Sequence, residues 1–256
     1  MYHLTQFGVA LPPGQVRVEA GTGAVIGHYV ALPGGGIYDT IGTGQAGRGT
    51  MRVRLLCELT GEDAADLKSQ FNALRQQIGV RRALRRRWDC DDEATEWVWA
   101  RLEEIRAETQ PRLPLWLPVE LRFLLLAAYW RGTERTEEFV GGSGDITLAN
   151  SGNITVTHTK ITVTGITAMA GGISVTNATL GGVGWAWQGA LGVADVLVVD
   201  TDSKSVTLNG VAAYDQLVLL GDSAAWLPLA PSGNLIELDM GAGSASVVFE
   251  WDDGWA

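Results

Sequence analysis

Apolar and hydroxyl residues alternate strictly in three short segments of the second half of the chain. These are residues 154–157 (Ile-Thr-Val-Thr), 161–164 (Ile-Thr-Val-Thr) and 173–176 (Ile-Ser-Val-Thr). Because successive side chains of a strand point to opposite faces, this alternation predicts strands that are buried on one side. Further apolar runs follow at 196–200, 205–208, 226–229, 235–239 and 246–251. With turn signals between them, such as Asn209-Gly210, they bring the total to about eight short strands, as in a sandwich or jelly roll.

The first half combines strand patterns with one amphipathic helix. Residues 16–18 and 52–59 have strand patterns, and Thr60-Gly-Glu-Asp63 then offers helix-capping side chains. Apolar residues recur after it at spacings of four, three and four (Leu67, Phe71, Leu74 and Ile78), with Gly79 just beyond. This spacing predicts a helix over about 62–78. No second helix with such a stripe is evident, so the stripe is expected to lie on a sheet.

A hairpin is expected next, because residues 83–88 and 97–102 flank the acidic segment 89–93. The alternation of Trp97 and Trp99 favours a strand, although residues 102–107 are equally compatible with a helix. Prolines 111, 114 and 118 interrupt the chain before the strand pattern of 119–123, and glycines at 141, 142 and 144 resemble a linker. The sequence therefore predicts a mainly β chain with two domains, 1–135 and 136–256.

Charge separates the same two parts. Residues 1–135 contain 17 Lys and Arg against 16 Asp and Glu, whereas residues 136–256 contain 2 against 13. The net charges are +1 and −11, which sum to the −10 of the chain. An acidic outer domain disfavours nucleic acid and anionic membranes as partners, since both are recognised largely through Lys and Arg. The longest apolar run, residues 123–130, is too short to cross a bilayer.

Motifs that would carry chemistry are absent or lack their context. Residues 42–47 satisfy G-x-G-x-x-G, but a strand pattern follows where a dinucleotide site needs a helix, so we expect a loop and no cofactor. The acidic segment 89–93 lacks the register of a calcium loop, and His3, His28 and His158 are scattered, so no metal site is expected. No G-x-S-x-G elbow is present. These observations predict a protein that is not an enzyme.

The two cysteines, Cys57 and Cys90, lack the spacing of a zinc or redox motif. We expect them to be free thiols in a reducing compartment.

One basic cluster stands out, and it contains Arg81, Arg82, Arg85, Arg86, Arg87 and Trp88. An aromatic ring within positive charge is compatible with single-stranded nucleic acid. The acidic segment 89–93 would neutralise this cluster in a hairpin, which favours a salt-bridged surface or a subunit contact. The candidate subunit-interface residues are Arg81, Arg85, Arg86, Arg87 and Trp88.

Tryptophan is abundant in the second domain, where Trp185, Trp187, Trp226, Trp251 and Trp255 occur. Exposed Trp on a sandwich can form a platform on which sugars stack. The ordinary alternative is that these rings fill the core or a subunit interface.

The order of these segments resembles the distal tail protein (Dit) family of siphophages. In the first domain the similarity lies in segments 66–74, 84–88, 100–102, 119–123 and Tyr129-Trp130. In the second it lies in segments 146–153, 161–165, 199–210 and 226–234. Together they cover nearly the whole chain.

The resemblance implies a structural protein of the virion tail tip that is assembled in the host cytoplasm. An N-terminal split β-barrel with one helix would form a hexameric ring, and a C-terminal galectin-like β-sandwich would project outward. The ring would join the tail tube protein to the tail hub protein of the baseplate, and DNA would pass through its lumen without specific binding. The alternative function is a carbohydrate-binding adhesin module that contacts the host cell wall.

Overall fold

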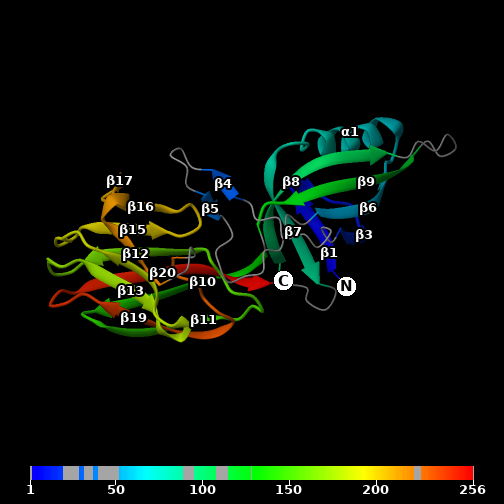
Figure 1. Cartoon of the computed structure of the whole chain (residues 1–256). Helices are drawn as coiled ribbons and strands as arrows, with labels where there is room; N and C mark the ends of the chain where they lie inside the picture. The colour runs from blue at the N-terminus through cyan, green and yellow to red at the C-terminus, as the bar shows by residue number, and fades with distance from the viewer. Residues whose placement is uncertain are drawn as a thin grey trace. The chain divides into compact units, whose positions relative to one another are not determined.

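The structure is a computed structural model that describes residues 2–19, 29–31, 37–39, 52–88, 95–107, 115–127, 129–221 and 226–255. The chain divides into two compact units (Figure 1). One comprises Met1–Gly27 and Ala46–Gly132, and the other comprises His28–Gln45 and Thr133–Ala256. Strands dominate both units, which confirms the predicted mainly β class.

The first unit is an antiparallel sheet with neighbours in the order β3-β6-β9-β8-β7-β1-β2. Its strands are β1 (Tyr2–Phe7), β2 (Val9–Ala10), β3 (Gly14–Glu19), β6 (Arg52–Thr60), β7 (Arg81–Trp88), β8 (Thr95–Ala107) and β9 (Trp116–Leu125), and β10 (Trp130–Gly141) begins there. Every second residue of β6, and of β9 from Val119 on, is buried, and Phe7 of β1 meets Phe123 of β9 edge to face at 5.1 Å. The alternation of the sequence thus builds a core on one face of the sheet.

Residues 102–107, for which a helix and a strand were equally compatible, are strand. They belong to β8, which pairs with both β7 and β9 and has an irregularity between Leu102 and Glu104. This segment pairs with β9, from Leu102 opposite Phe123 to Ala107 opposite Val119, and the pairing gives its backbone groups partners that periodicity alone does not reveal.

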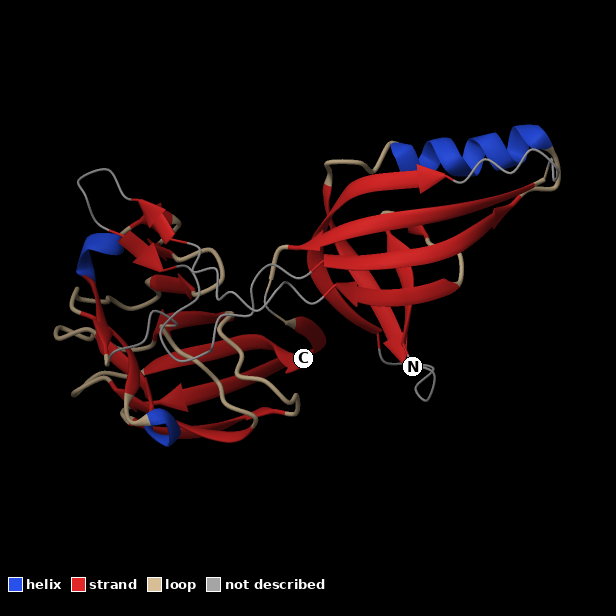
Figure 2. Cartoon of the chain, turned by 45° about the vertical axis from the view of Figure 1, so that its right-hand side comes forward, coloured by secondary structure: helices blue, strands red, loops and turns tan. Residues whose placement is uncertain are grey.

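The one α-helix among the described residues, α1 (Ala64–Arg75), lies along one side of this sheet (Figure 2). It is shorter than the predicted 62–78. Asp63 is the N-cap, since its side chain accepts a hydrogen bond from the backbone N–H of Asp66 at 2.8 Å. Of the predicted stripe, Leu74 is buried, whereas Ile78 is 43% exposed and bridges to Leu102 beyond the helix. The last turn of the predicted helix is therefore absent, and Ile78 contacts the sheet instead.

The second unit contains two packed sheets. One follows the order β17-β16-β15-β12-β20-β10 and the other β11-β19-β13-β14-β18. The strands are β11 (Gly144–Asn150), β12 (Thr159–Gly165), β13 (Ile173–Asn177), β14 (Val183–Trp187), β15 (Val196–Asp200), β16 (Ser205–Leu208), β17 (Val211–Ala212), β18 (Leu217–Leu220), β19 (Ser232–Asp239) and β20 (Ala245–Trp255). Short 3-10 helices occupy Ala178–Leu180 and Tyr214–Gln216, and β4 (Tyr29–Ala31) pairs with β5 (Ile37–Asp39).

Two of the three alternating segments are strands, as predicted, in β12 and β13. Residues 154–157 are not a strand, because only Val156 forms a bridge, to Leu229. The Asn209-Gly210 turn between β16 and β17 has positive φ at both residues, 52° and 78°, as its sequence predicts.

One hydrophobic core joins the two sheets and contains Trp185, Trp187, Trp226 and Trp251, all buried. Three fully buried asparagines, Asn150, Asn177 and Asn234, tie the segment before β19 into this core. Asn234 Oδ1 accepts from the Ala230 N–H at 2.8 Å and from Asn177 Nδ2 at 3.0 Å. Its Nδ2 donates to carbonyls of Ala230, Ser232 and Leu148 at 2.9, 3.1 and 3.3 Å. The Asn234 amide thus gives hydrogen-bond partners to backbone groups of β11, of β19 and of the segment before β19.

Candidate assembly surface

The five candidate interface residues lie on β7, where strand alternation divides them between two faces. Arg81, Arg85 and Arg87 are exposed, Trp88 is half-buried and Arg86 is buried. Only Arg86 is thus removed from the surface of the chain.

Arg86 lies at the centre of an aromatic cluster. Its Nε donates to Glu96 Oε2 at 2.5 Å, and its guanidinium carbon stands 4.3 Å from the ring centroid of Trp130. The rings of Tyr2 and Trp88 lie at 4.9 and 5.1 Å from the same carbon, and Trp88 Nε1 donates to Glu96 Oε1 at 3.1 Å. Burial raises the pKa of the Tyr2 hydroxyl, and Arg86 partly offsets this. The cluster ties β1, β7, β8 and the start of β10 together.

The opposite face of β7 and β8 alternates arginine with tryptophan. Arg85 pairs in register with Trp97, Arg81 pairs with Arg101, and Trp97 and Trp99 meet edge to face at 5.5 Å. The Arg81 guanidinium carbon lies 4.5 Å from the centroid of Trp99. We call Arg81, Arg85, Trp97, Trp99 and Arg101 the Arg/Trp face. Guanidinium groups stacked on aromatic side chains are typical of protein–protein interfaces.

Arginines elsewhere on the same side of the sheet have carboxylate partners. Arg122 of β9 meets Glu104 at 2.9 Å and Glu120 at 3.0 Å. Arg106 donates to Glu104 at 2.7 Å, and this hydrogen bond is the main cause of the lowered pKa of Glu104. The arginines of this half of the sheet therefore have carboxylate partners, whereas Arg81, Arg85 and Arg101 of the Arg/Trp face have no ion pair with any described carboxylate.

The sequence contained a signal for part of this arrangement. Leu84 and Arg86 are two residues apart, so a strand places them on the same face, and an apolar Leu84 marks that face as the core. Trp97 and Arg101, by contrast, were not singled out as interface residues. Their place beside Arg85 and Arg81 follows from the register of β7 with β8, whereas the sequence predicted only that these two segments form a hairpin.

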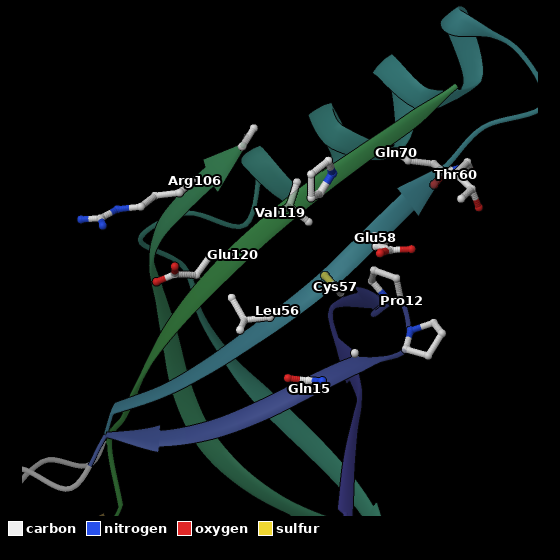
Figure 3. Close-up of a pocket in the computed structure, with 14 residues that line it drawn as sticks. Pro12, Gln15, Leu56, Cys57, Glu58, Thr60, Gln70, Arg106, Val119 and Glu120 are labelled. Atoms are coloured by element: carbon white, nitrogen blue, oxygen red, sulfur yellow. The ribbon is translucent and has the colours of Figure 1, made fainter. Parts of the chain in front are cut away.

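An open hollow lies beside β3, β6 and β9 (Figure 3). Its lining consists of Pro12, Pro13, Gly14, Gln15, Leu56, Cys57, Glu58, Thr60, Gln70, Arg106, Ala107, Pro118, Val119 and Glu120. The thiol of Cys57 is intrinsically the most nucleophilic group in this lining, but burial raises its pKa to about 12. At neutral pH this thiol is protonated, and the hollow offers no activated nucleophile.

Cys57 is expected to react slowly with thiol reagents in the folded chain. In a Cys90→Ser variant, in which Cys57 is the remaining cysteine, the thiolate fraction at pH 8 falls from about 0.2 to about 10⁻⁴ on folding. Ellman's reagent should therefore react about 10³-fold more slowly with the native chain than with the chain in guanidinium. A native rate within tenfold of the unfolded rate would show that the thiol is accessible and activated.

Several sequence expectations fall outside the described residues: the 42–47 glycine motif, His28, the acidic segment 89–93 and Cys90. Within the described part of the chain, no group of three or more His, Cys, Asp and Glu is placed to hold a metal ion. There, too, no helix has the length and apolarity needed to span a membrane.

Comparison with known proteins gives a structural likeness only. No protein-family model and no curated protein sequence matches the chain. The crystal structure of SPP1 Dit, described as a paradigm of the hub adsorption apparatus in phages that infect Gram-positive bacteria, superposes with a TM-score of 0.63 at 14% identity. The match covers 98% of this chain and 99% of SPP1 Dit. This likeness confirms, at the level of the fold, the resemblance seen in the sequence.

Two structures of the phage P2 baseplate in its activated conformation, with Ca and with Sr, match at TM-scores of 0.36 and 0.35. Each is 9% identical and covers 96% of this chain and 90% of the other. These scores are too low to support an argument about the fold.

Proposed function

We propose that this chain is a structural tail-tip protein of a siphophage that forms a hexameric ring between the tail tube protein and the tail hub protein. The first unit builds the ring, the sandwich of the second unit projects from it, and DNA passes through the lumen without specific binding. The ring is assembled in the host cytoplasm and is part of the virion tail.

One observation carries this proposal: the likeness to SPP1 Dit extends over both units and over nearly the full length of both chains. A fold shared by many functions would support it weakly, because function belongs to sites and not to folds. A likeness that covers both units from end to end is more restrictive than a likeness to one common domain. The Arg/Trp face adds support, since a ring requires surfaces that bind other copies.

Of the five tryptophans that the adhesin alternative offers as a platform, Trp185, Trp187, Trp226 and Trp251 are buried, and Trp255 is half-buried. Trp185 and Trp187 are 0% and 1% exposed and belong to the core of the sandwich. An indole ring that is packed among core side chains cannot stack on a sugar unless the sheet unfolds. These two residues therefore stabilise the sandwich.

Mass photometry of the purified chain, alone and with the tube and hub proteins, tests the proposal. We expect a closed six-fold species, and in micrographs of intact particles a gold label on the chain should mark the tail tip. A chain that stays monomeric with both partners, or a label located elsewhere on the particle, would contradict the proposal.

A further inference from the structure

The Arg/Trp face contains a like-charge pair that no described carboxylate neutralises. Arg81 and Arg101 lie directly opposite each other on β7 and β8, and both are exposed. Like charges directly opposite each other weaken strand pairing. Among the residues that the structure describes, no carboxylate forms an ion pair with either guanidinium.

The acidic segment 89–93 follows the far end of β7. Arg81 begins β7 and Trp88 ends it. At about 3.3 Å per residue of strand, these two residues are about 23 Å apart. The cation pair at Arg81 and Arg101 therefore needs a carboxylate from another source.

The second unit presents the opposite arrangement. Asp145 of β11 lies directly opposite Glu237 of β19, and both side chains are exposed on the outer face of the five-stranded sheet. The basic residues of this unit are Arg135, Lys160 and Lys204. Each is engaged elsewhere: Arg135 with Asp253 at 2.8 Å, Lys160 with Glu250 at 2.7 Å, and Lys204 over the Trp226 ring at 5.1 Å.

We propose that the Arg81–Arg101 pair of one copy binds the Asp145–Glu237 pair of a second copy. Both pairs are cross-strand neighbours in antiparallel sheets, so their side chains start from about the same separation, roughly 5 Å between Cβ atoms. Two guanidinium forks and two carboxylates at matched spacing form bidentate ion pairs. The contact removes the like-charge repulsion in both sheets at once.

This contact joins two different surfaces, so it is heterologous and generates a closed ring when its rotation closes. The inference rests on the proposed ring, which the first units build, and adds a contact that holds the sandwich of one copy to the first unit of its neighbour. A protein partner is favoured over nucleic acid, because the chain carries a net charge of −10, which repels a polyanion at long range.

Charge reversal in the full-length chain tests the contact by mass photometry. We expect Arg81→Glu with Arg101→Glu to weaken assembly at least tenfold, and Asp145→Lys with Glu237→Lys to do the same. Mixing the two reversed proteins should restore rings in which the variants alternate, since each reversed surface then meets an opposite charge. The chain that carries all four substitutions should also assemble.

Two controls separate this contact from general effects. Arg17→Glu with Arg75→Glu changes the net charge equally at exposed positions of the first unit and should leave assembly unchanged. Arg101→Glu alone places a carboxylate opposite Arg81, so its monomer should melt at or above the temperature of the wild-type monomer, while its assembly is still weakened.

The outcomes separate this inference from the proposed function. The proposed contact is wrong if the reversed variants form rings as well as the wild-type chain does, or if mixing them fails to restore assembly. Neither result contradicts the proposed ring. A wild-type chain that never assembles overturns both. Loss of binding to a DNA duplex in fluorescence anisotropy, with assembly intact in the Arg81→Glu and Arg101→Glu variant, would assign the face to nucleic acid and overturn the contact.

Discussion

Glu96→Ala is expected to lower the local free energy of unfolding around β7 and β8 by about 3–5 kcal/mol, because it removes the carboxylate that contacts the buried guanidinium of Arg86. Arg86 is 3% exposed and Glu96 is 5% exposed, so water cannot replace the lost carboxylate. Trp88 Nε1 loses its acceptor in the same substitution. Hydrogen exchange of the β7 and β8 amides in the full chain measures the effect without assuming that both units unfold together.

A matched pair on the surface provides the control for this prediction. Arg52 and Glu103 meet at 2.9 Å but have exposed side chains, so Glu103→Ala should cost at most about 1 kcal/mol. The double variant Arg86→Met with Glu96→Leu removes both charges and should recover much of the loss. Equal effects of Glu96→Ala and Glu103→Ala would show that the buried pair contributes no more than a surface one.

Asn234→Ala is expected to destabilise the second unit by roughly 3–5 kcal/mol, because several buried polar groups lose their partner together. The amide of Asn234 is hydrogen-bonded to backbone groups of Leu148, Ala230 and Ser232 and to the side chain of Asn177. Methyl cannot replace any of these bonds, and the fully buried site excludes bulk water. Urea denaturation followed by the fluorescence of the buried tryptophans measures the loss.

Leu235→Ala, one residue along β19, is the control for this second prediction. Its side chain is 38% exposed on the outer face, so its cost should stay near 0.5 kcal/mol. If Asn234→Ala were as mild as Leu235→Ala, then the asparagine network would not hold the segment before β19 in place.

The arginines of β7 show how far sequence reasoning reaches. Their clustering beside Trp88 was visible in the sequence, and the parity of Leu84 and Arg86 marks one of them as core-facing. That Arg86 is paired with Glu96, ten residues away, depends on the register of β7 with β8. Register is set by side chains from both strands and by the turn between them, so neither strand reveals it alone.

By itself, the sequence determined the mainly β class, the single amphipathic helix, the acidity of the second half and the alternation that fills the core. These are local properties, because a period of two or 3.6 residues is written in neighbouring positions. The tertiary structure alone decided that residues 102–107 are strand, that residues 154–157 are not, and that Arg81 and Asp145 each face a like charge. Each of these outcomes depends on which distant strand lies alongside, and the free energy of that pairing is shared between segments that are far apart in the chain.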